Sequence, residues 1–338
     1  MISSKLVIVF LLFFIVIEVF IYLKNGFFTN TSQENVVPTV SEQRYYWKEK
    51  IRQMGSQRAY DLFKLENQQN EQDVQHTYAH IFGELLYNAE KIEGIGICDA
   101  TFAFGCYHSF FGQALSRNGD KIVKDLDIEC IKKFGPLGTG CQHGIGHGLM
   151  ENMGPGKLDE ALEICSTIQT LTYLGCTSGV FMEYNFPTLI DDASAIVQTR
   201  KFDVNNPFHP CESIKSKYQQ SCYFELGKWW QEVLDSDFAK MGMLCQTIRT
   251  DSKRESCFLG VGYALGHETN YDSSKSKIIC QDMPSSEAQM LCLSGVAWSF
   301  YAEPGKKDEY QTICSDLSDD RRLVCLDKAD LTKAKSSS

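Results

Sequence analysis

The chain has 338 residues, a formal net charge of −10 and a sequence pI near 5.3, and it contains 14 cysteines. This length corresponds to one large domain or two ordinary ones. The acidic balance, without a clustered stripe of Lys and Arg, argues against a nucleic-acid partner, because phosphate recognition depends on such clusters.

The N-terminal part of the chain differs in kind from the rest. Residues 6–23 are apolar except for Glu18, and these 18 residues would extend about 27 Å as a helix, close to the hydrocarbon thickness of a bilayer. Residues 24–28, which follow, lack the small-residue pattern of a cleavage site. We therefore predict an uncleaved signal anchor in residues 1–28, with a cleaved signal peptide as the alternative.

The cysteine content indicates the compartment of the remaining chain. An even number of cysteines, 14, suits an oxidising environment such as a periplasm, a cell surface or a secretory lumen. We predict a single-pass membrane protein whose C-terminal domain is extracytoplasmic. Residues 29–70 would form a polar spacer and a first helical segment, residues 71–330 a helical repeat domain, and residues 331–338 a disordered tail.

The cysteines reveal an internal repeat. They fall into seven sequence-neighbour pairs: Cys98 and Cys106, Cys130 and Cys141, Cys165 and Cys176, Cys211 and Cys222, Cys245 and Cys257, Cys280 and Cys292, Cys314 and Cys325. The second members are separated by 35, 35, 46, 35, 35 and 33 residues. The longer step contains the polar, proline-bearing segment 201–210, which we interpret as an insertion.

Each unit follows the same pattern. In residues 141–165 the apolar stretch CQHGIGHGLM is followed by the turn ENMGPGK and by a second helical stretch, LDEALEIC. A period of about 35 residues with two helices per unit is typical of an α-solenoid, and the chain resembles the tetratricopeptide and Sel1-like repeat class. The resemblance implies an all-α fold with essentially no strand. The characteristic Trp, Tyr and Pro positions of that class are not reproduced, so it implies no functional residue.

The repeat explains most of the cysteines and several glycines structurally. Within a pair, the first cysteine ends one helix and the second begins the next, so a disulfide would join adjacent antiparallel helices. Thiolate ligation of a metal is the alternative, because the sequence alone does not prove connectivity. Three residues after the second cysteine, most units carry glycine, which predicts close helix packing; these residues are Gly144, Gly179, Gly260 and Gly295, with Ser109 and Glu225 as exceptions.

The histidines that remain are candidates for a metal centre. His143 and His147 lie four residues apart, as do His76 and His80, and each pair falls on one face of a predicted helix. His108 is the repeat equivalent of His143, so the two would lie on neighbouring helices. Histidines gathered from several helices form metal centres in bundle proteins, and such a site favours zinc, copper or iron.

Glu183 is the predicted carboxylate ligand from the next unit. The alternative for all these residues is a structural role. The histidines would then be buried neutral imidazoles hydrogen-bonded to neighbouring carbonyls, and the glutamate would pair with another residue of its helix. His267, near a predicted helix end, is expected to act in capping. The Trp229–Trp230 pair is expected to fill the core between repeats.

Two functions are consistent with these features. The first is a membrane-anchored binding scaffold for a protein, peptide or glycan ligand, with a histidine-rich metal centre in its N-terminal repeats. The second is a metal-dependent extracytoplasmic enzyme that uses His76, His80, His108, His143 and His147. No HExxH, GxSxG or GxxxxGK motif occurs in the sequence, and the sequence therefore indicates no particular reaction.

Overall fold

The structure of the chain is a computed structural model that describes residues 39–99, 101–102, 104–135, 138–168, 174–190, 195–303 and 305–329. The predicted anchor in residues 1–28 and the predicted tail at 331–338 lie outside the described residues, so both stay predictions. Among the described helices, none combines the length and the apolar character that a membrane span needs. The described residues from Val40 onward belong to one compact unit.

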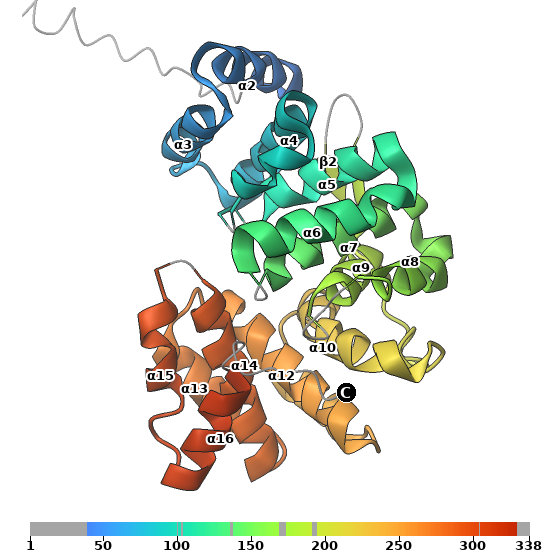
Figure 1. Cartoon of the computed structure of the whole chain (residues 1–338). Coiled ribbons are helices and arrows are strands. Elements are labelled where there is room, and N and C mark those ends of the chain that lie inside the picture. Colours follow the sequence, from blue (N-terminus) through green and yellow to red (C-terminus); the bar gives the residue numbers. More distant parts are fainter. Residues whose placement is uncertain are drawn as a thin grey trace, which may run out of the picture. The chain divides into compact units, whose positions relative to one another are not determined.

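A row of inner helices forms the centre of this unit, and successive inner helices make the most extensive contacts between elements (Figure 1). After the first of them, each contains the second cysteine of a pair. The inner helices are α4 (Gln72–Glu90), α5 (Gly105–Asn118), α7 (Thr139–Met153), α9 (Cys176–Asn185), α10 (Ser216–Val233), α12 (Asp251–Glu268), α14 (Ser286–Ala302) and α16 (Asp319–Ala329). Apolar residues at helical spacing explain the row, since Phe258, Val261 and Leu265 of α12 are all buried.

Shorter outer segments connect the inner helices. They are η1 (Lys91–Gly96), α6 (Val123–Phe134), α8 (Leu158–Cys165), α11 (Phe238–Gln246), α13 (Ser273–Gln281) and α15 (Tyr310–Ile313). Single 3₁₀ turns lead into three of them, namely η2 (Gly119–Ile122), η4 (Pro155–Lys157) and η5 (Lys307–Glu309). The alternation of outer and inner helices confirms that the chain is built from disulfide-linked helical hairpins.

Seven disulfides join the cysteines, each to its sequence neighbour, as predicted. Thiolate ligation is therefore wrong as an explanation of these cysteines. Each bond closes a short loop between an outer segment and the next inner helix, and such a loop contributes about 3 kcal/mol of stability in the chain-entropy account. Seven disulfides also indicate an oxidising, extracytoplasmic compartment.

Glycines allow the inner helices to touch through their backbones. A Cβ atom on Gly146 of α7 would lie 1.9 Å from the Cys176 carbonyl oxygen of α9, and one on Gly179 would lie 1.9 Å from the His143 carbonyl oxygen. The same holds in the C-terminal half, where a Cβ atom on Gly260 would lie 1.9 Å from the Phe224 carbonyl oxygen. No side chain fits at these crossings, which confirms the close packing predicted from the repeated glycine.

The long step of the repeat contains the only strands among the described residues. β1 (Thr188–Ile190) and β2 (Ala195–Val197) form an antiparallel hairpin, with Thr188 opposite Val197. α9 ends at Asn185, and Pro187 cannot extend it because proline lacks the backbone N–H. The prediction of an all-α fold with essentially no strand is therefore confirmed, and this small hairpin of two three-residue strands, rich in β-branched residues, is the only addition to it among the described residues.

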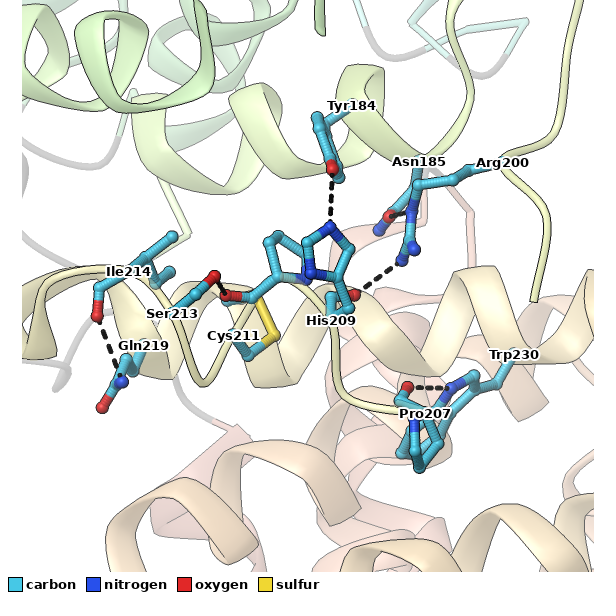
Figure 2. The surroundings of a disulfide bond; sticks show 12 residues. Tyr184, Asn185, Arg200, Pro207, His209, Cys211, Ser213, Ile214, Gln219 and Trp230 are labelled. Carbon is cyan, nitrogen blue, oxygen red and sulfur yellow. Dashed lines mark hydrogen bonds between the residues drawn. A yellow bond between two sulfur atoms is a disulfide. The ribbon is translucent and has the colours of Figure 1, made fainter. Parts of the chain in front are cut away.

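Turns follow the hairpin and are fastened to α10 by two tryptophans, of which Figure 2 shows Trp230. The Trp230 indole donates to the Pro207 carbonyl over 3.2 Å, and the Trp229 indole donates to the Arg200 carbonyl over 2.8 Å. The Arg200 guanidinium lies 3.5 Å from the centre of the Trp229 ring and donates to the His209 carbonyl. Both tryptophans are fully buried, which confirms their predicted core role.

Two further helices, α2 (Val40–Met54) and α3 (Ser56–Asn67), occupy most of the segment that we predicted as spacer and first helical segment. They contribute large aromatic side chains to the core rather than only a polar connection. Trp47 packs on Phe63 and Phe82 with ring centroids 5.0 and 5.9 Å away. The described core therefore begins with α2, about 30 residues before the predicted repeat domain.

A glycine substitution tests the backbone contacts. Gly260→Ala should lower the free energy of unfolding by about 2–3 kcal/mol, because its methyl group would force α10 and α12 apart. Gly156→Ala is the matched control, since a Cβ atom there meets nothing within 4 Å, and it should change stability by less than about 0.5 kcal/mol. Urea unfolding of the purified protein measures both; equal effects would contradict the tight crossing.

Candidate metal centre

Five histidines from three inner helices meet in one continuous group, which we name the histidine seam: His76, His80, His108, His143 and His147. The ring centroids of His76 and His80, one turn apart on α4, are 4.6 Å apart. His108 of α5 lies between the pairs, 5.4 Å from His80 and 4.1 Å from His147 of α7. The close packing of α4, α5 and α7 therefore produces the seam.

Three of these side chains can hold a metal ion. One ligand nitrogen each from His76, His80 and His108 lie within 4.8 Å of one another. The Nε2 atoms of His76 and His80 are 3.0 Å apart, close to the separation of about 3.3 Å that two nitrogens have around a tetrahedral zinc ion. His76 and His108 are partly exposed whereas His80 is buried, so the site is reachable from solvent.

Hydrogen bonds on the far side of two rings orient their Nε2 atoms toward this centre. The Nδ1 atom of His76 lies 2.8 Å from the Phe102 carbonyl oxygen, so it carries the proton and leaves Nε2 as a lone-pair donor. The Nδ1 atom of His80 lies 2.9 Å from the Ser109 hydroxyl oxygen, which can accept a hydrogen bond from the Nδ1–H group. A carbonyl or hydroxyl behind a histidine is the usual support of a metal ligand.

The loop that presents the Phe102 carbonyl is strained. Phe102 and Phe104 both have left-handed backbone conformations, with φ of 59° and 62°. Bulky residues rarely adopt this conformation, and it costs on the order of 1–3 kcal/mol at each position. Such strain is commonly found at functional sites, which agrees with the position of this loop against His76.

The other end of the seam is built around His147. Its Nδ1 atom lies 3.0 Å from a Glu183 carboxylate oxygen, and its Nε2 atom lies 3.1 Å from the Met182 sulfur. Both His147 and Glu183 are buried, each 4% exposed. The predicted carboxylate therefore reaches the seam, where it contacts an imidazole N–H rather than the three-histidine group.

His143 has two hydrogen-bonding partners. Its Nδ1 atom lies 3.0 Å from the Ser178 hydroxyl, and the Leu174 backbone also hydrogen-bonds the ring. Ser178 in turn donates to the Glu225 carboxylate. In a nucleophilic triad the histidine lies between the serine and the carboxylate. Here the carboxylate contacts the serine instead, so His143, Ser178 and Glu225 do not have the order of such a triad.

Burial lowers the pKa of three imidazoles of the seam, those of His80, His108 and His143. It lowers the pKa of His80 and of His108 well below the usual range, and neighbouring histidines add to the effect. Burial, with a smaller contribution from His147, lowers the pKa of His143 to about 3. The neutral imidazole is the form that ligates a metal ion, so these side chains are ready to bind at physiological pH.

Two carboxyl groups beside the seam have the opposite shift. Burial raises the pKa of Glu225 to about 7, partly opposed by the hydrogen bond from Ser178. Burial and the charge of Glu183 raise the pKa of Glu151 to about 8, and Glu151 follows His147 by one helical turn. Titratable groups with such shifts are concentrated at functional sites.

The structure thus brings the six predicted site residues into one region. His267 lies outside it, and its Nδ1 atom hydrogen-bonds the Tyr271 hydroxyl over 2.8 Å, a side-chain contact rather than a cap. No role was predicted for Met182 or Ser178, nor for two of the exceptions in the glycine pattern. Ser109 and Glu225 are those exceptions, and both belong to the hydrogen-bond network of the seam, so the interruption of the pattern was the available signal.

A comparison of the chain with known protein families, curated proteins and solved structures finds no match.

The raised pKa of Glu225 predicts a pH dependence. Folded Glu225 keeps its proton up to about pH 7 whereas the unfolded chain releases it near pH 4.5, so its contribution to stability falls as the pH rises between these values. Glu225→Gln should remove that loss, which is about 3 kcal/mol. The variant should therefore gain stability over the wild type at pH 8 relative to pH 5.

Urea unfolding at pH 5 and pH 8 with a chelator present measures this difference. The comparison is made with the wild type because the buried histidines act in the opposite sense, losing stability as the pH falls below 6.5. Glu232→Gln, an exposed change on the same helix, is the matched control and should follow the wild type. A Glu225→Gln variant with an unaltered pH dependence would show that the carboxyl is ionised in the folded protein.

Proposed function

We propose that this protein is an extracytoplasmic helical-repeat protein that binds a transition-metal ion through His76, His80 and His108. The observation that supports the proposal is the convergence of three imidazole nitrogens within 4.8 Å. The Nε2 atoms of His76 and His80 face each other, and in the described part of the chain no hydrogen bond to the His108 ring is found. A buried polar side chain that only fills a core ordinarily has a hydrogen-bond partner.

The donor set indicates the class of metal. Three neutral nitrogens suit zinc, copper or iron, whereas magnesium and calcium require oxygen ligands. The seven disulfides leave no cysteine as a competing thiolate ligand. A three-histidine set leaves a fourth position open for water or another ligand.

A metal-dependent enzyme is the second candidate, and one observation favours it. Glu151 is partly exposed beside the seam, with a pKa raised to about 8, so its carboxyl group can donate a proton at neutral pH. An open metal position near such a group is the arrangement used in metal-assisted hydrolysis. Loss of a metal-dependent activity in Glu151→Gln, with metal affinity retained, distinguishes this candidate from a binding protein.

The proposal also includes the location and the partner of the domain. The apolar residues 6–23 would tether it to a membrane, and the compartment is the oxidising one that the disulfides require. The helical row would bind a protein, peptide or glycan ligand, as helical-repeat proteins generally do on an extended surface.

Metal content and stability test the three-histidine site. The full-length protein, stripped with a chelator and titrated with zinc, should bind one equivalent at this site and gain about 2.7 kcal/mol of stability when free zinc is 100 times the Kd. His80→Gln and His108→Gln should each abolish this gain, because two imidazoles remain. Calorimetry and thermal unfolding measure the two quantities.

His209→Gln is the matched control, since His209 is exposed and hydrogen-bonds Tyr184 outside the seam. It should bind zinc like the wild type. If wild type and both seam variants had equal zinc content and equal stabilisation, the histidines would be core residues and the proposed function would be wrong.

A further inference from the structure

The far end of the seam contains a pair of donor atoms that the three-histidine site does not use. The His147 Nε2 atom and the Met182 sulfur are 3.1 Å apart. We propose that these two atoms form a second metal position that is selective for copper(I). The inference does not depend on occupancy of the site formed by His76, His80 and His108.

The first step concerns the His147 tautomer. Its Nδ1 atom faces the Glu183 carboxylate at 3.0 Å, and a carboxylate accepts a hydrogen bond, so the proton of the neutral ring is on Nδ1. The Nε2 atom then presents a lone pair to the Met182 sulfur. The Nε2 atom and the sulfur are then two lone-pair donors with no proton between them, and a soft cation can bind to both.

The second step concerns the metal. Thioether sulfur is a soft ligand that selects copper(I), and imidazole is an accepted copper ligand. Zinc is bound in proteins by thiolate, imidazole and carboxylate rather than by methionine. The pair therefore differs in selectivity from the all-imidazole site a few ångströms away.

The third step concerns charge. Glu183, which lies directly behind His147, carries a single negative charge. The charge of a divalent ion in this buried position would be larger than that of Glu183. A monovalent ion is balanced by that carboxylate, and buried charges are stable only when they are balanced. The carboxylate also fixes the orientation of the imidazole, which is the usual support of a histidine ligand.

The fourth step concerns fit and access. At bond lengths of about 2.0 Å to nitrogen and 2.3 Å to sulfur, a tetrahedral angle places the two donors about 3.5 Å apart. Methionine has three rotatable side-chain bonds, so Met182 can move by the few tenths of an ångström that this requires. Met182 is partly exposed, whereas His147 is buried, so an ion would enter past the thioether.

Copper(I) affinity in a background without the first site tests the proposal. The full-length His80→Gln protein is titrated anaerobically with copper(I) against a chromophoric copper(I) chelator. Adding Met182→Leu, which keeps the apolar volume, should weaken the copper(I) affinity at least about tenfold. Adding Met241→Leu, a change of the same kind at a fully buried methionine of α11, should leave it unchanged.

X-ray absorption spectroscopy of the copper-loaded protein provides the second measurement. It should show one sulfur neighbour that disappears in Met182→Leu. Equal copper(I) affinities with and without Met182, or a spectrum without sulfur, would overturn the proposal and leave the contact between His147 and Met182 as a packing contact of the core. Zinc binding by the Met182→Leu single variant should be that of the wild type, so failure of the first site is recognised separately.

Discussion

Direct contact between the backbones of successive inner helices determines where every functional side chain lies. At Gly146 and Gly179 the helices α7 and α9 approach so closely that a Cβ atom would lie 1.9 Å from a carbonyl oxygen of the partner. Helices in such contact have their neighbouring side chains in a defined register. Residues two and six places after the second cysteine of each unit consequently form a row across the helices, and His108 and His147 are members of that row.

The disulfides add a second constraint, because each of them joins an inner helix to the segment that precedes it. A helix that begins at a bridged cysteine, as α9 does at Cys176, cannot slide along its neighbour without breaking the bond. The crossing glycines set the distance between helices, and the disulfides set their axial position. Precise placement of polar groups in a metal site requires both, because ligands must be held within about 0.5 Å of the productive geometry.

The period of the sequence was sufficient to predict the hairpins, the pairing of the cysteines and the role of glycines such as Gly260, because each repeats at a constant interval. It was also sufficient to predict that His108 and His143 lie on adjacent helices. It was insufficient for features that occur once, such as the β1–β2 hairpin and the packing of Trp47 in α2, since no second copy exists for comparison. Met182 was missed because a methionine on an inner helix is ordinarily a core residue.

The C-terminal repeats show what the same positions contain in the absence of a site. Phe224, Tyr263 and Trp298 occupy the positions of the row there, and their rings pack with centroids 5.2–6.1 Å apart. Aromatic rings at these positions gain stability from burial, whereas imidazoles must have each nitrogen hydrogen-bonded or ligated to avoid a penalty. The seam therefore replaces a stabilising apolar row with a polar one on an unchanged scaffold. A protein retains such a replacement, at the expense of stability, where the polar groups perform a function.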